Sequence, residues 1–242
     1  MEWLPVSSSG FIVLISMLLG SQFLEAIDIA LALHLGSGLA AFLALYRDIV
    51  DMVRASRSIY GVDIRVYALG LPISILVALA IYSALARISM DTSLAMVLIG
   101  VGLIATSIAV QRRGGGGGLK RVTALDIVAL FILQGMAILP GVSRSGLVLA
   151  YLGYRGVEPE KAFRINLVVA IPILILAGVY GLYTLAKSIG IEMLIVAQLI
   201  VFVVSYLIIR YMLHILRKVS TWVFTMFIGI ALVATSIPTL LH

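Results

Sequence analysis

Two short segments of the chain combine a proline, several small residues, serines and a closing glycine. They are PVSSSG at residues 5–10 and PGVSRSG at residues 140–146. The second differs mainly in having Arg144 where the first has Ser8. A guanidinium suits bidentate contact with phosphate or carboxylate, and hydroxyls and the N–H groups at a helix start also favour an anion. Together the two segments predict an oxyanion-binding site.

Arg144 stands among long apolar stretches. An arginine at the centre of a bilayer costs at least ~2.5–3.5 kcal/mol on insertion scales, so it requires a partner or a water-filled cavity. Small serines and glycines also permit close helix packing, and Arg144 would then only neutralise a glutamate. For the serines both interpretations stay open, whereas the cost of burying the arginine favours a functional role.

Glu2 is the natural carboxylate partner of Arg144. It can hold a divalent cation, activate water or neutralise the guanidinium, and the sequence does not choose among these. His34 and Gln134 lie in apolar surroundings, where helix packing and ligand binding are both open. The candidate catalytic residues are Glu2, Ser8 and Arg144, with Glu2 as the metal ligand. The candidate substrate-binding residues are Ser7, Ser9, Ser143, Ser145, Gly141, Gly146, Gln134 and His34.

The composition describes a polytopic membrane protein. Of 242 residues, 62% are hydrophobic and 12% charged, whereas soluble domains carry about a quarter charged residues. The net charge of +6 does not indicate nucleic-acid binding, because the basic residues gather in loops between apolar runs and not on one solvated face. With no cysteine, disulfides and thiolate metal sites are excluded.

Apolar runs bounded by charged or turn residues predict six full transmembrane helices, each near the ~20 residues needed to cross a bilayer. They cover about 27–46, 66–86, 93–110, 163–185, 191–213 and 220–241. The stretches at about 11–20 and 124–153 are apolar but short or interrupted, and breaks at membrane depth must be buried or line a wet cavity. We therefore expect re-entrant or broken helices there, in an all-α integral membrane protein.

Arginine and lysine crowd the connections on one side of the predicted spans. These connections are residues 47–65, 111–123, 155–164 and 210–218, whereas only Arg87 and Lys187 fall on the other side. By the positive-inside rule the crowded side is cytoplasmic and the carboxyl terminus is outside, in a multi-pass protein of the cell membrane.

The two halves of the chain repeat one order of elements in opposite directions. Residues 1–110 and 124–242 each contain a serine segment followed by three spans, and the basic, glycine-rich loop 111–123 joins them. This order predicts an inverted-topology repeat, in which a site forms near the membrane midplane where broken helices of both halves meet. The two serine segments are therefore expected to face each other.

Four segments resemble, in order and spacing, those of the undecaprenyl-diphosphate phosphatase family (UppP, also called BacA). They are EWLPVSSSG, ALHLGSGLAAFLALYRDIV, QGMAILPGVSRSG and FRINLVVAIP, and the resemblance extends from residue 2 to about residue 180. It implies a membrane enzyme that hydrolyses a polyprenyl diphosphate to the monophosphate and so recycles the lipid carrier of cell-envelope glycans. It also implies a divalent cation, Mg²⁺ or Ca²⁺, as cofactor.

Residue by residue, the resemblance assigns metal or water handling to Glu2. Ser8 takes the place of the family's important serine, as nucleophile or phosphate ligand, and Ser143 and Arg144 take that of its diphosphate-binding pair. Phe11 departs from the family, which ordinarily has histidine there. Family members also carry an upstream re-entrant helix that ends in another glutamate, and the sequence begins too late to contain it.

These departures favour diphosphate binding over rapid hydrolysis. The alternatives are a polyprenyl-phosphate flippase or transporter, since inverted repeats with broken helices also build transporters, and a catalytically impaired homologue that still binds lipid phosphate. The expected partners are a polyprenyl diphosphate lipid and the membrane, and a homodimer stays open.

Overall fold

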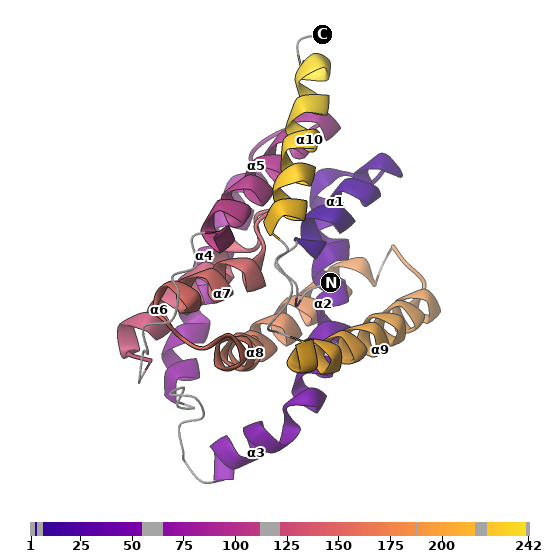
Figure 1. The fold of residues 1–242 in the computed structure, drawn as a ribbon. Coiled ribbons are helices and arrows are strands. Elements are labelled where there is room, and N and C mark those ends of the chain that lie inside the picture. The colour runs from indigo at the N-terminus through magenta and orange to yellow at the C-terminus, as the bar shows by residue number, and fades with distance from the viewer. Residues whose placement is uncertain are drawn as a thin grey trace.

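The computed structural model describes residues 3, 7–54, 65–111, 122–186, 188–215 and 222–240, and in these residues the chain forms ten helices (Figure 1). They are α1 (Ser8–Leu18), α2 (Phe23–Ala44), α3 (Tyr46–Arg54), α4 (Arg65–Leu85), α5 (Thr92–Gln111), α6 (Ala124–Met136), α7 (Arg144–Tyr154), α8 (Pro159–Leu185), α9 (Ile191–Ile215) and α10 (Trp222–Leu240). In Figure 1, α3 lies at one end, and α5 and α10 lie side by side towards the other.

Four helices, α2, α5, α8 and α9, are long and apolar enough to cross a membrane, counted over the described residues. Each overlaps a predicted span to within a few residues at either end. The other two predicted spans coincide with α4 and α10, which have 21 and 19 residues. The all-helical membrane fold is therefore confirmed, and the count of six spans stays a prediction.

The interrupted stretch 124–153 forms two short helices, α6 and α7, joined by a turn at residues 137–143. With 13 and 11 residues, neither reaches the ~20 residues that a membrane span needs. The apolar stretch near the start likewise forms only the 11-residue α1. Both serine segments thus stand at the beginning of a short helix.

Helix α3 lies where the sequence predicted only a connection, and this is a correction. Apolar residues at positions 46, 49, 50 and 53 follow the spacing of a surface helix with one apolar stripe. The charged residues at 47, 48, 51 and 54 hid this stripe, because the connections were identified by their charge. Ile49 packs against the main hydrophobic core.

The core is centred on α2 and α8, which cross at small residues. A Cβ on Gly178 would meet the backbone of Leu35, and one on Gly181 would meet the backbone of Ala32. Small residues let two helix backbones approach closely, which is a main source of helix association in a bilayer. This contact fixes the two helices that flank the serine segments.

Gln198 of α9 inserts its side-chain amide into the backbone of α2. Its Oε1 accepts a hydrogen bond from the Gly36 N–H at 2.8 Å, and its Nε2 donates to the Ala32 carbonyl at 3.1 Å. In a regular α-helix these two backbone groups, four residues apart, bond to each other. One glutamine therefore holds the turn of α2 that carries His34.

Candidate functional site

The two serine segments end in the same helix cap. Ser7 precedes α1 and accepts a hydrogen bond from the Gly10 N–H, and Ser143 precedes α7 and accepts one from the Gly146 N–H, both at 3.2 Å. Serine is among the preferred N-cap residues because its hydroxyl satisfies one backbone donor of the first turn. The positive ends of two helix dipoles are therefore placed by equivalent residues of the two segments.

The tips of the segments touch through glycines. A Cβ on Gly10 would lie 2.8 Å from the Gly141 nitrogen, closer than a side chain can approach. Gly141 itself has φ +91°, which L side chains rarely adopt, and a Cβ on it would meet the backbone of Ile99 in α5. The expectation that the segments face each other agrees with this contact.

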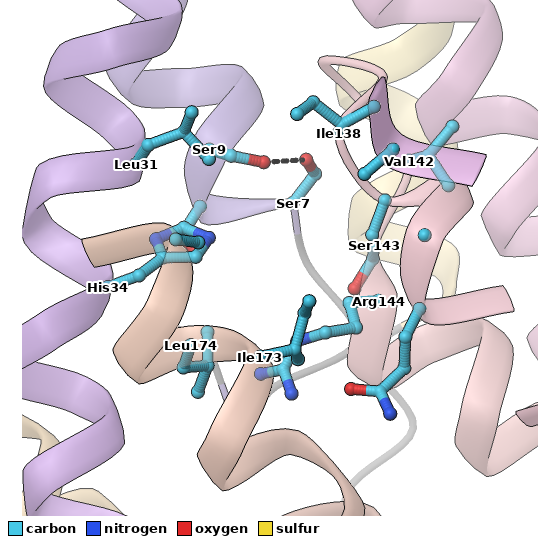
Figure 2. Close-up of a pocket in the computed structure, with 16 residues that line it drawn as sticks. Ser7, Ser9, Leu31, His34, Ile138, Val142, Ser143, Arg144, Ile173 and Leu174 are labelled. Carbon is cyan, nitrogen blue, oxygen red and sulfur yellow. Dashed lines mark hydrogen bonds between the residues drawn. The ribbon is translucent and has the colours of Figure 1, made fainter. Parts of the chain in front are cut away.

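A cavity of about 80 Å³ lies between the two helix starts (Figure 2). This is several times the roughly 10–15 Å³ that one water requires. Its lining includes seven of the predicted site residues: Ser7, Ser8, Ser9, His34, Gln134, Ser143 and Arg144. The predicted residues Gly141, Ser145 and Gly146 belong to the second segment but not to the lining, and Glu2 lies outside the described residues.

Figure 2 shows Ser7 and Ser9 joined by a hydrogen bond on one side of this space, with Ser143 and Arg144 on the other. The hydroxyls of Ser7 and Ser9 lie 3.3 Å apart, and those of Ser143 and Ser145 lie 3.4 Å apart. Apolar side chains such as Leu31, Ile173 and Leu174 complete the wall. The cavity thus combines hydroxyls and one cation with an apolar surround, which strengthens electrostatic contacts inside it.

Arg144 is buried, with 7% of its surface exposed. Its guanidinium carbon lies 5.2 Å from the centre of the Trp3 ring, within the range of a cation–π interaction. Trp3 is itself 1% exposed. Trp3 was not among the predicted site residues, although its place beside Glu2, just before the first serine segment, could have pointed to it. An indole at this distance stabilises the positive charge of the buried guanidinium.

Thr106 of α5 holds the start of α7. Its Oγ1 accepts a hydrogen bond from the Ser143 N–H at 3.1 Å, and a Cβ on Gly146 would lie 2.6 Å from its methyl group. Thr106 is 1% exposed. Thr106 was not among the predicted site residues, because hydroxyl residues are common in membrane helices and do not mark a site by themselves. Because Arg144 directly follows Ser143, this hydrogen bond also sets the position of Arg144.

Gln134 contacts a neighbouring helix and also faces the cavity. Its Nε2 donates to the Val169 carbonyl of α8 at 3.0 Å, which ties α6 to α8. Gln134 also lines the cavity, and its Oε1 has no partner among the described residues. The sequence left helix packing and ligand binding open, and both stay predictions, since Nε2 contacts α8 and Oε1 has no partner among the described residues.

Asp126 joins the first turn of α6 to the end of α7. Its carboxylate accepts hydrogen bonds from the Thr123 N–H at 2.8 Å and the Tyr151 hydroxyl at 2.7 Å, and lies 3.2 Å from Nε of Arg155. Burial raises the pKa of this carboxyl, but the hydrogen bonds and the arginine outweigh it and hold the pKa below its usual range. In the sequence, Thr123 and Asp126 form the Thr-x-x-Asp pattern of a capping box, which could have pointed to Asp126.

Comparison with known proteins matches residues 1–234 to the family described as Bacitracin resistance protein BacA. Several curated relatives are named undecaprenyl-diphosphatase. The chain is 32% identical to the one from Haloarcula marismortui over an aligned length of 250, and the alignment covers 96% of the chain and 92% of the relative. It is 30% identical to that of Carboxydothermus hydrogenoformans over 229 residues, or 91% and 86%. It is 35% identical to that of Desulforudis audaxviator over 182 residues, or 73% and 69%.

Proposed function

The chain belongs to the bacitracin resistance protein BacA family, and on that premise we propose that it hydrolyses a polyprenyl diphosphate of the undecaprenyl type. The match confirms the family resemblance carried by the four sequence segments. One observation carries the proposal: Arg144 and serines of both segments line one cavity between helices that are apolar enough for a membrane. The products are the polyprenyl monophosphate, which returns to the carrier cycle, and inorganic phosphate.

Binding of the diphosphate rests on Arg144 and the two helix starts. The guanidinium provides charge-assisted donors, and Ser7, Ser9 and Ser143 provide hydroxyls on opposite sides of the cavity. The amino-terminal ends of α1 and α7 add partial positive charge. The lipid tail lies among the apolar helices, whose side chains continue from the cavity wall.

Hydrolysis breaks the bond between the terminal phosphorus and the bridging oxygen, which keeps the electron pair. Ser8, which lines the cavity, is the proposed nucleophile or phosphate ligand, and Glu2 is the proposed carboxylate that positions the attacking group. Negative charge that develops on the departing phosphate is stabilised by Arg144 and the fixed N–H donors, which need no reorganisation during the reaction.

A divalent cation, Mg²⁺ or Ca²⁺, is part of the proposal through Glu2. Both ions prefer oxygen ligands, and Mg²⁺ is often held by one or two carboxylates together with substrate phosphates. The described residues contain no group of three His, Asp or Glu able to hold a metal, and the described lining supplies hydroxyls, amides and a cation. This part of the chain does not by itself fit a metal centre, so we assign no step to the cation.

The decisive experiment measures inorganic phosphate released when the purified full chain is incubated with a polyprenyl diphosphate, with and without a chelator. Release is expected, and loss of release with the chelator would support the cation. Movement of the lipid phosphate across liposomes without release would contradict hydrolysis and favour the flippase. Binding of the diphosphate without release or movement would indicate an impaired homologue.

The impaired homologue has a specific observation in its favour. Phe11, in the first turn of α1 beside the serines, cannot transfer a proton. Restoring the family residue with Phe11→His tests this directly. Unchanged release would mean that this chain works without the imidazole, whereas a large gain would show that the native chain had lost most of its activity.

A further inference from the structure

A second cavity, of about 460 Å³, opens where α2 ends and α8 begins. It shares no lining residue with the cavity between the serine segments. Along both α2 and α8 the two sites are nine residues apart, from His34 to Leu43 and from Ile173 to Arg164. At 1.5 Å per residue this separation is about 13.5 Å. The second cavity is lined by Leu43, Ala44, Leu45, Tyr46, Arg47, Asp48, Arg164, Tyr206 and Arg210.

The charges of this lining favour an anion. Its one acidic residue, Asp48, is bound by Nη1 of Arg164 at 3.2 Å, and the same arginine contacts Glu160 at 3.3 Å. Arg47 and Arg210 form no ion pair with a carboxylate in the part of the chain that the structure describes. The Arg210 guanidinium lies over the Tyr206 ring, 5.7 Å from its centre. Among the described residues, therefore, no carboxylate neutralises these two guanidinium groups, and both are able to contact an anionic ligand.

The position of the cavity points to the membrane surface. It lies at the ends of α2 and α8 and along the last turns of α9, three of the helices apolar enough to cross a bilayer. Tyr46 and Tyr206 have the apolar ring and polar tip that are enriched at the level of lipid head groups. Only 6% of the most apolar stretch of α9 is buried, so an exposed apolar surface runs from the cavity into the bilayer.

We propose that this cavity binds the phosphate head group of an anionic phospholipid, whose acyl chains lie along α9. The arginine fork matches phosphate oxygens, and basic pockets between membrane helices are suited to acidic lipid head groups. The sequence predicts this end of the molecule to be cytoplasmic, which is the side where acidic lipids give the membrane surface its negative potential. The inference does not depend on the proposed hydrolysis, because the two cavities have no residue in common.

Native mass spectrometry of the full chain in detergent, titrated with phosphatidylglycerol or phosphatidylcholine, tests the proposal. We expect tighter binding of phosphatidylglycerol and a loss of roughly tenfold or more for the double variant Arg47→Gln/Arg210→Gln, because each basic residue near the surface adds to the attraction. Arg87→Gln removes one charge at an exposed position outside the cavity and should bind as the native chain does.

Equal retention of the two lipids by the native chain, or unchanged retention by the double variant, would overturn the proposal. Millimolar inorganic phosphate forms the second arm: if it displaces phosphatidylglycerol, the cavity is a site for soluble phosphate and not for a head group. Arg47 is exposed, so the single variant Arg47→Gln keeps the test decisive should the double variant fail to fold.

Discussion

Ser7 and Ser143 accept the same hydrogen bond in the two halves of the chain, each from the backbone N–H of the glycine three residues later, at 3.2 Å. The next position is Ser8 in one segment and Arg144 in the other. One scaffold therefore presents a hydroxyl from one side of the cavity and a guanidinium from the other.

Replacing Arg144 should remove phosphate release. Arg144→Ala is expected to abolish turnover of a farnesyl or longer diphosphate, and Arg144→Lys to lose about tenfold or more, because lysine keeps the charge but not the planar fork. The measurement is inorganic phosphate released in detergent, with Arg87→Ala as the control for loss of a basic side chain at an exposed position. Retained turnover by Arg144→Ala would remove the assigned role.

The two caps should contribute similarly to stability. Ser7→Ala and Ser143→Ala each remove an N-cap acceptor, a change that typically costs about 1 kcal/mol. For a chain of this size that corresponds to about 2–4 °C in the apparent melting temperature. Ser7→Thr and Ser143→Thr keep a capping hydroxyl and serve as matched variants. If alanine and threonine variants melt together, the caps do not stabilise α1 and α7.

The membrane helices were predictable because their apolar runs are long and bounded. The predicted range 191–213 became α9, residues 191–215, and 93–110 became α5, residues 92–111. Errors arose where a charged residue was taken as a boundary. Helix α8 begins at Pro159, in the first helical turn where proline is well tolerated, and continues through the charged Glu160 and Lys161 into the predicted span.

The site was only partly predictable because its supporting contacts join distant parts of the chain. The serine segments were identified by their own pattern, and the family resemblance added their roles. No local pattern connects Trp3 to Arg144 or Thr106 to Ser143, because both contacts depend on how helices pack. The division into repeats at 1–110 and 124–242 stays a prediction.

A methyl group at the meeting point of the segments should be strongly destabilising. In Gly10→Ala the new Cβ would lie 2.8 Å from the backbone nitrogen of Gly141, which cannot swing away as the end of a flexible side chain can. The overpacking is expected to cost about 1–3 kcal/mol and to reduce phosphate release. Gly190→Ala is the matched control, because nothing lies within 4 Å of its added Cβ. Equal melting temperatures for the two variants would contradict the close contact.

Gln198→Leu should loosen the junction of α2 and α9. The leucine keeps much of the volume but leaves the contacts at the Gly36 N–H and the Ala32 carbonyl unmade. A net contribution of about 0.5–1.5 kcal/mol per hydrogen bond predicts a lower melting temperature. The loss should exceed that of Gln111→Leu, at an exposed glutamine. Hydrogen exchange of the α2 turn around His34 should also rise, and unchanged exchange would mean that the amide does not hold this turn.

The contact of Asp126 with α7 should make the stability of the α6–α7 pair depend on pH. Because its folded-state pKa lies below the usual value of about 3.9, its contribution to stability is present above that value. The contribution is lost as the pH falls through the lowered pKa, when the carboxylate takes up a proton and releases Arg155. Asp126→Asn should therefore melt at a lower temperature than the native chain at pH 7, and the difference should shrink below about pH 4. Asp51→Asn changes an exposed carboxylate in α3 and is the control; a difference for Asp126→Asn that is the same at both pH values would show that the carboxylate charge is not what joins the two helices.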